Sequence, residues 1–185
     1  TELAATENRK MALRIIEAGL SAIKTQNAVS SSIKLKNDIL SVAGKNFILS
    51  EFKKIKVVGF GKASVEAALA LEKILGSKIT EGAVVDIHKA NSEYVEIFVG
   101  THPRPSRINV NAGKKIYEII KNGSADDLII VLVSGGGSAL LCLGNDECSQ
   151  GIKLYDAFLK SGKTIMEMNT VRKHLSFLKG GGLAK

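Results

Sequence analysis

The sequence contains no tryptophan, two prolines and two cysteines among its 185 residues, and aromatic side chains make up 5% of it. Two cysteines are too few for the disulfide framework of a small secreted protein, so we expect free thiols at Cys142 and Cys148 and a cytoplasmic location. No apolar run approaches the roughly 20 residues of a membrane-spanning helix, so no membrane contact is expected.

The scarce aromatic residues also bear on the type of ligand. They are not interleaved with basic residues as in proteins that stack nucleic-acid bases, and the sequence carries no zinc-finger, homeodomain or RRM signature. A nucleic-acid partner is therefore not expected. The net charge of +8 suits a phosphate-bearing small molecule, although a solvated basic surface is the simpler explanation for it.

The N-terminal third and the remainder of the chain differ in pattern. Apolar residues at helical spacing predict a helix over 6–23, followed by a polar break over 27–32 and a small antiparallel hairpin or meander within 33–52. From Lys56 onward, short apolar runs alternate with amphipathic stretches. They predict strands at 56–60, 82–87, 95–99 and 128–133, and helices at 64–75, 109–121, 151–160 and 164–178.

Strands that alternate with helices indicate βαβ units and a parallel sheet. The run LIIVLV (128–133) is apolar on both faces, so we expect it to be the most buried strand, with helices covering both sides. The predicted fold is α/β: a three-layer Rossmann-like domain with a mostly parallel sheet, extended by a small N-terminal helix and a β-hairpin.

Three unusual segments follow predicted strands, at the sheet edge where ligands of open parallel sheets bind. They are GFGKAS (59–64), THPRPS (101–106) and SGGGS (134–138). Glycines without a Cβ allow the backbone to approach a ligand closely and to point N–H groups at it, and the following helix adds its positive N-terminal end. The SGGGS segment therefore predicts a phosphate-binding turn, the alternative being a sharp turn that needs glycine only for its dihedral angles.

Polar side chains near these segments are candidates for the same site. On its loop Lys62 is able to reach a phosphoryl group, although a loop lysine is also commonly just solvated. His102 either makes structural hydrogen bonds or lines the pocket. Asn169 and Arg172 share a helical face with Ser176 in NTVRKHLS, which is either functional or simply the polar outer face of that helix.

A dinucleotide-binding fingerprint, GxGxxG, is matched in part. Gly59 and Gly61 fit it, but Ser64 occupies the position of the third glycine. Asp86 ends the next strand, near where a ribose-binding acid would lie, so an NAD(P)-binding function is not excluded. The P-loop motif GxxxxGK[ST] is not matched, because Lys56 stands where it requires glycine and Ala63 where it requires serine or threonine. Asp126 and Asp127 precede their strand, so they lie at the opposite edge of the sheet, and a turn is favoured there over a metal site.

Taken together, VVGFGKAS, THPRP, DDLIIVLVSGGGSALL and NTVRKHLSFLKGGGLA resemble, in the same order, the N-terminal domain of type 2 glycerate 2-kinases, the family also called MOFRL. The resemblance runs from about residue 9 to the C-terminus. It implies ATP-dependent phosphorylation of D-glycerate to 2-phosphoglycerate, with Mg²⁺, in a cleft between two α/β domains. Family members are considerably longer, so we expect residues 1–185 to be the N-terminal domain, with the second domain and its acidic Mg²⁺ ligands outside this chain.

Combined with the residue patterns, the resemblance gives a set of expected site residues. Lys62 and Arg172 are expected to be catalytic, and no metal ligand is expected among these residues. Phosphate, nucleotide or substrate binding is expected of Gly61, His102, Ser134, Gly135, Gly136, Gly137, Ser138 and Asn169. A homodimer is compatible with the family. Two alternatives stay open: an NAD(P)-dependent hydroxypyruvate reductase, and a non-catalytic module that binds phosphate or nucleotide.

Overall fold

A four-stranded parallel sheet forms the centre of the protein, as the computed structural model of the chain shows for residues 2–185. Its strands are β4 (Lys54–Phe60), β5 (Glu81–Asp86), β6 (Glu96–Val99) and β7 (Asp127–Val133), in the order β6-β5-β4-β7. Numbered along the chain this order is 3-2-1-4, that of a Rossmann half-sheet, and it places the topological switch point between β4 and β7. The predicted α/β, Rossmann-like class is confirmed.

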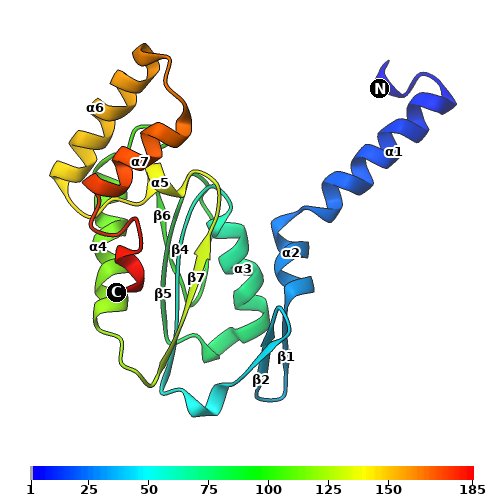
Figure 1. Ribbon diagram of the computed structural model, residues 1–185. Helices are drawn as coiled ribbons and strands as arrows, with labels where there is room; N and C mark the ends of the chain where they lie inside the picture. The colour runs from blue at the N-terminus through cyan, green and yellow to red at the C-terminus, as the bar shows by residue number, and fades with distance from the viewer. Residues whose placement is uncertain (1) are drawn as a thin grey trace.

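Two long helices cover the sheet, one on each face. α3 (Ser64–Leu75) and α4 (Arg107–Lys121) lie on opposite sides of it in Figure 1. Every residue of β4 from Ile55 to Gly59 is buried, as is nearly all of β5, because side chains from both faces meet a helix. One core cluster forms around α3 and includes Val57, Leu71 and Val84; the other forms around α4 and includes Val58 and Ile116. The domain therefore has the three layers that the sequence predicts.

The prediction for the last strand was wrong. LIIVLV was expected to be the most buried strand, yet β7 lies at the edge of the sheet, where the side chains of Val131 and Val133 are 42% and 66% exposed. The run of apolar residues shows that side chains on both faces of the strand are apolar, but it does not indicate where the strand lies in the sheet. Within residues 2–185, β5 and β4 are the interior strands of the sheet. β7 pairs only with β4, in parallel register from Lys54–Asp127 to Phe60–Val133.

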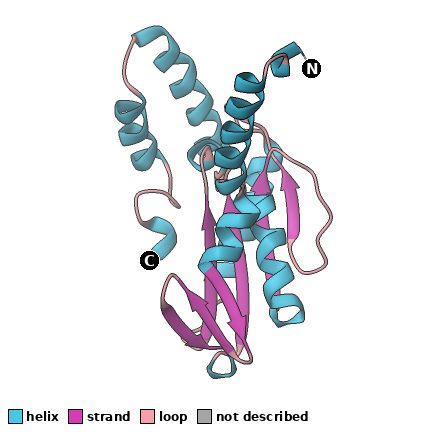
Figure 2. Ribbon diagram, turned by 90° about the vertical axis from the view of Figure 1, so that its right-hand side faces the viewer, coloured by secondary structure: helices cyan, strands magenta, loops and turns pink. Residues whose placement is uncertain are grey.

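The N-terminal part is an extension. α1 (Glu7–Ala22) begins at Thr6, whose side chain accepts a hydrogen bond from the backbone N–H of Arg9, and the helix projects away from the sheet (Figure 1). The polar break expected over 27–32 is wrong: α2 (Thr25–Ser32) continues through it, since packing against α3 outweighs the low helix propensity of its serines and asparagine. The meander is confirmed as β1 (Ile33–Lys36), β2 (Ile39–Val42) and β3 (Lys45–Ile48), at the bottom of Figure 2.

The C-terminal part is helical. α5 (Gly137–Leu140), the helix expected after the glycine turn, is a single turn. α6 (Asn145–Ser161) begins before the expected residue 151, and α7 (Ile165–Leu175) ends before the expected residue 178. Short 3₁₀ turns cover Glu2–Ala4, Leu49–Glu51, Gly76–Lys78 and Gly182–Ala184. Within residues 2–185, no helix is both long and apolar enough to cross a membrane.

Lys56, near the start of the interior strand β4, is fully buried, although lysine is seldom buried without a partner. Its side chain is 1% exposed, and its Nζ lies 3.2 Å from Asp127 Oδ2 on β7. The same ammonium donates to the carbonyl oxygens of Asn122, at 2.9 Å, and Ile119, at 3.2 Å. This ion pair joins β4 to β7 and to the end of α4, at the opposite end of the sheet from the glycine segments.

Replacing Lys56 with methionine should strongly destabilise the domain. Removing one member of a buried pair leaves Asp127 without its counter-charge, and we expect the melting temperature to fall by roughly 10 °C. The matched control is Lys115→Met, which breaks the pair between Lys115 and Glu81, 35% and 40% exposed. An exposed pair contributes little, so the control should melt within about 2 °C of the wild type. Equal shifts in the two variants, followed by circular dichroism, would contradict this role for the buried pair.

Candidate functional site

The loops that follow β4 and β7 lie against each other at the switch point of the sheet. Ser134 N–H donates to the carbonyl of Phe60 at 3.1 Å, Lys62 N–H donates to the carbonyl of Gly135 at 2.8 Å, and Ala63 N–H donates to Ser134 Oγ at 3.1 Å. Gly61, at φ +128°, permits this contact, because a Cβ there would overlap both the side chain and the backbone of Ser134. The two predicted segments are therefore one structural unit.

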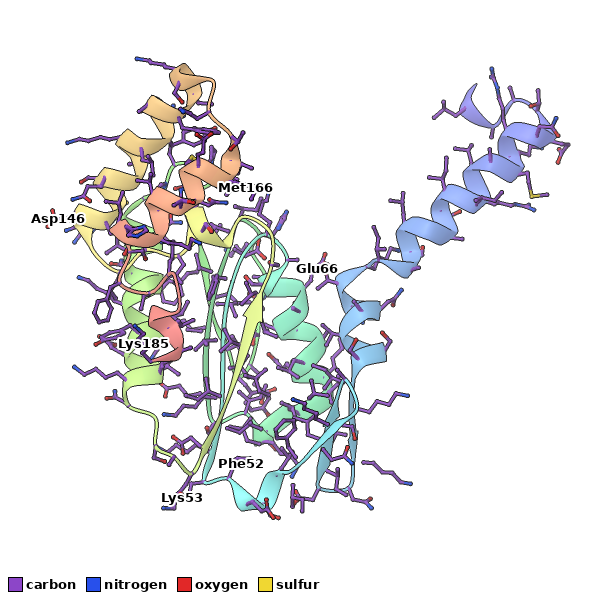
Figure 3. All side chains as sticks on the ribbon, in the orientation of Figure 1. Phe52, Lys53, Glu66, Asp146, Met166 and Lys185 are labelled. Atoms are coloured by element: carbon purple, nitrogen blue, oxygen red, sulfur yellow. The ribbon has the colours of Figure 1, made fainter. Side chains whose placement is uncertain are left out.

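Figure 3 shows which end of the sheet carries this unit. The labelled Glu66 lies near the start of α3 and Met166 lies on α7, and both mark the end of the sheet where β4 and β7 finish. Phe52 and Lys53, labelled at the opposite end, precede β4. The glycine segments thus occupy the carboxyl edge of the strands, where open α/β sheets bind ligands.

The glycine turn presents free backbone donors. Gly136 adopts φ +85°, in the left-handed region, and the short helix α5 starts at the next residue. Gly137 N–H is used, since it donates to the carbonyl of Ser134 at 3.2 Å. The N–H groups of Gly135, Gly136 and Ser138 have no acceptor within residues 2–185. Successive unpaired N–H groups at such a turn form a concave site for an anion.

The predicted site residues come together around one pocket of about 430 Å³. All of them except Gly61 line it, and Gly61 lies beneath it in contact with Ser134. Sequence reasoning missed the apolar part of the wall. The full lining is Phe60, Lys62, His102, Val133, Ser134, Gly135, Gly136, Gly137, Ser138, Ala139, Ile165, Asn169 and Arg172. The alternative of a turn that needs glycine only for its dihedral angles does not account for this convergence.

The pocket carries positive charge without a carboxylate to balance it. Lys62 and Arg172 both line it, and neither forms an ion pair within residues 2–185. Burial lowers the pKa of the Arg172 guanidinium from its ordinary value, yet a guanidinium stays charged at neutral pH. A half-buried cation without a partner is costly unless an anion joins it, so the site favours an anionic ligand.

Asn169 adds an unsatisfied acceptor to the same pocket. Its Oδ1 is buried and has no hydrogen-bond partner within the described residues. α7 positions it one turn before Arg172, and a capping box between Thr164 and Glu167 fixes the start of that helix. Ser176, expected on the same helical face, lies beyond the helix and instead accepts a hydrogen bond from the backbone N–H of Lys179. Buried polar atoms without a partner are rare in folded proteins, so this amide is not explained by packing within residues 2–185.

The side chain of Ser134 is committed to structure. Its Oγ accepts from Ala63 N–H and so joins the two loops, while Ser138 is exposed at the start of α5. The Ser134 hydroxyl therefore helps to shape the pocket.

Asp86 is also structural, which argues against a dinucleotide site. The carboxylate is fully buried and accepts hydrogen bonds from the N–H groups of Val65, at 3.0 Å, and Ile87, at 2.6 Å. It thereby caps the start of α3, and it does not face a ribose. Ser64, in place of the third glycine of the fingerprint, is buried and donates to the carbonyls of Gly61 and Val85.

Cys142 lies near this region but has no chemical role that its environment supports. Both cysteines are free and buried. Burial, together with the neighbouring Cys148, raises the pKa of the Cys142 thiol to about 12. The thiol therefore stays protonated and unreactive at neutral pH.

His102 is expected to titrate below its ordinary pKa of 6.5. Burial lowers the pKa of this imidazole, and the nearby charges of Lys62 and Arg172 lower it further. Because the unfolded chain binds the proton first as the pH falls, neutral His102 contributes to stability above pH 6.5, and the contribution is lost as the pH falls through the folded-state pKa. NMR titration of the ring protons measures this pKa directly, and Lys62→Met should raise it. A pKa unmoved by that substitution would show that the two side chains do not interact.

The fold and the pocket define an α/β domain with a positively charged pocket at the switch point of a parallel sheet. A family model described as "Domain of unknown function (DUF4147)" matches residues 11–185. A glycerate 2-kinase from Pyrococcus horikoshii is 35% identical over 185 residues, which is 98% of this chain and 41% of the relative. The crystal structure of a glycerate kinase from Thermotoga maritima superposes with a TM-score of 0.76 at 30% identity, over 95% of this chain and 40% of that one.

The chain belongs to the DUF4147 family, the domain that it shares with glycerate 2-kinases, as the resemblance predicts. It spans about 40% of the length of the curated relatives it matches along its whole length. A relative from Agrobacterium vitis, 41% identical over 133 residues (70% of this chain, 30% of the relative), carries a provisional hydroxypyruvate reductase name. The glycerate kinase name recurs across several organisms.

Proposed function

We propose that this chain is the N-terminal α/β domain of a two-domain glycerate 2-kinase, which transfers the γ-phosphoryl group of ATP to the 2-hydroxyl of D-glycerate. The observation that carries the proposal is the meeting of the free N–H groups of the glycine turn with Lys62 and Arg172 in one pocket. The names of the relatives support the same reaction. A homodimer and a cytoplasmic location are part of the same proposal.

The phosphate groups of ATP fit the glycine turn. Phosphoryl transfer depends on positioning and on stabilising the charge that spreads over the phosphoryl oxygens. The N–H groups of Gly135, Gly136 and Ser138 donate hydrogen bonds to those oxygens, and the Lys62 ammonium neutralises the charge that develops on the transferred group. The backbone N–H of Lys62 donates to the carbonyl of Gly135 at 2.8 Å, so the loop that carries the ammonium lies directly against the turn.

D-glycerate fits the side of the pocket formed by α7. Arg172 binds its carboxylate, for which the planar guanidinium offers two parallel donors. The amide of Asn169, whose side chain lines the same pocket, binds a substrate hydroxyl. Side chains spaced three residues apart on one helix therefore recognise a carboxylate and a hydroxyl of the same small molecule.

Mg²⁺ would neutralise phosphate charge in such a reaction, but the residues present do not fit it. Within residues 2–185, no three His, Cys, Asp or Glu side chains are grouped so that they could hold a metal ion, and the pocket lining includes no carboxylate. The ligands of the ion belong, on this proposal, to the second domain.

A coupled assay of ADP release tests the reaction in the full-length protein. Glycerate-dependent ADP release with formation of 2-phosphoglycerate supports the kinase. Oxidation of NADH by hydroxypyruvate with no ADP release would replace it by the reductase. Tight, salt-sensitive binding of duplex DNA without any response to ATP would instead favour a binding module.

A further inference from the structure

The pocket holds two cations and several neutral groups, but one side chain among its lining residues is able to take up a proton near neutral pH. Lys62 and Arg172 carry their full complement of protons, the serines and Asn169 are not basic, and no carboxylate lines the pocket. His102 remains. A kinase that acts on an alcohol needs an acceptor for the hydroxyl proton, so the composition of the pocket itself singles out this residue.

We propose that His102 is the proton acceptor for the substrate hydroxyl, a catalytic role that rests on the kinase activity proposed above.

The imidazole ring lies directly against the glycine turn. A Cβ placed on Gly136 would be 3.2 Å from both Cδ2 and Nε2 of His102, and 3.0 Å from Cε of Lys62. The Nε2 edge of the ring and the Lys62 side chain therefore flank the same point of the turn. A hydroxyl group that attacks a phosphorus atom held at this turn lies next to Nε2, which is the geometry that general base catalysis requires.

A buried amide fixes the His102 loop against the glycine segment. Asn109, which is fully buried, accepts a hydrogen bond from Thr101 N–H at 2.9 Å. Its Nδ2 donates to the carbonyl of Thr101, at 3.1 Å, and to that of Leu140, at 3.0 Å. Thr101 directly precedes His102, and Leu140 ends the helix that the glycine turn begins. Asn109 is thus a positioning residue, and its spacing after Ser106, as in a capping box, was the signal in the sequence.

The charges around the ring keep it neutral until the anion arrives. Lys62 faces it from the loop after β4 and Arg172 faces it from α7, while Arg104 of its own loop is paired with Asp156 of α6. Burial and the first two cations hold the pKa of His102 below its ordinary value, so the base form predominates at pH 7. A bound phosphate offsets both cations, and the pKa of the ring then rises toward the range where it accepts a proton efficiently.

The 2-hydroxyl oxygen of the substrate forms a bond to the γ-phosphorus, while its proton passes to Nε2 of His102. The bond between the γ-phosphorus and the β–γ bridging oxygen breaks, and ADP leaves with that electron pair. The imidazolium then releases its proton to solvent, which restores the neutral ring.

The main test is the pH dependence of turnover in the full-length protein. His102→Gln should lower kcat by about 10²–10⁴-fold, leave KM for ATP within threefold, and abolish the fall in kcat at acid pH that protonation of His102 should cause in the wild type. The matched control is His174→Gln, an exposed histidine of α7 whose ring bonds to the carbonyl of its own helix; it should retain wild-type kcat and the acid limb.

A second measurement does not depend on turnover. Inorganic phosphate added to the wild-type chain should raise the pKa of His102, followed by NMR of the ring, and leave His174 unmoved. If phosphate leaves the pKa of His102 unchanged, the proposal is overturned, because the ring then does not face the bound anion.

Two kinetic results would also overturn it. One is a kcat of the H102Q variant within threefold of the wild type. The other is a reduced kcat in this variant that still falls at acid pH as in the wild type, because His102 would then have only a structural role. A wild-type protein without glycerate-dependent ADP release would overturn the kinase itself, and the role of His102 with it. The wild-type assay therefore tests the kinase activity, and the H102Q variant tests the role of His102 separately.

Discussion

Replacement of Lys62 by alanine should lower kcat about 10²–10³-fold while KM for D-glycerate changes little. The ammonium acts mainly on charge that develops during phosphoryl transfer, and the loss of one such group at a preorganised site costs turnover rather than ground-state binding. The side chain is exposed and lies beside the glycine turn, so its removal leaves no cavity and should not change the melting temperature by more than about 2 °C.

A matched lysine controls for the loss of charge alone. Lys89 is exposed in the loop that follows β5 and does not line the pocket. Lys89→Ala removes the same charge from the same end of the sheet, and turnover should stay within twofold of the wild type. Wild-type turnover in the Lys62 variant, measured by ADP release, would remove Lys62 from the mechanism.

Gly136→Ala should weaken binding of inorganic phosphate or ATP by at least tenfold, a loss of about 1.4 kcal/mol. The new methyl group would lie 3.0 Å from Lys62 Cε and 3.2 Å from the His102 ring, so it fills the space that the anion needs. The left-handed backbone at φ +85° adds a stability cost of about 1–2 kcal/mol for alanine.

The neighbouring glycine provides the control. Gly135 has an ordinary φ, and a Cβ there would have no heavy atom within 4 Å. Gly135→Ala should therefore bind phosphate within about twofold of the wild type by isothermal calorimetry. Equal losses in the two variants would mean that the glycines serve the turn in general and that the Gly136 position does not face the ligand.

Local sequence patterns predicted the parts of this domain whose structure is decided locally. Helix α3 was predicted at its observed bounds, and β4 and β5 within two residues, because their apolar periodicity and flanking glycines mark their ends. The pocket followed from one general rule, that loops at the carboxyl edge of a parallel sheet converge. That rule brought the segments of Lys62, His102 and Ser134 to one edge, whereas Arg172, on a helix, was expected there from the family resemblance.

The errors arose where distant contacts decide the outcome. Whether β7 is central or at the edge depends on strand order, which periodicity does not encode. The 27–32 segment is helical because α3 supports it, and Lys56 is buried because Asp127 and two carbonyls receive its charge. Asn109 was overlooked for the same reason: its partners at Thr101 and Leu140 are separated from it by 8 and 31 positions along the chain.

The place of β7 at the rim of the sheet has a consequence for the dynamics of the pocket. Lys62 is attached to β4, which is hydrogen-bonded on both sides, whereas the glycine turn is attached to a strand that is hydrogen-bonded on one side within residues 2–185. Local opening costs least at such a rim. The β4 side of the pocket is therefore rigid, and the glycine turn on β7 is more mobile. A phosphate that bridges Lys62 and the turn would restrict the motion of the turn.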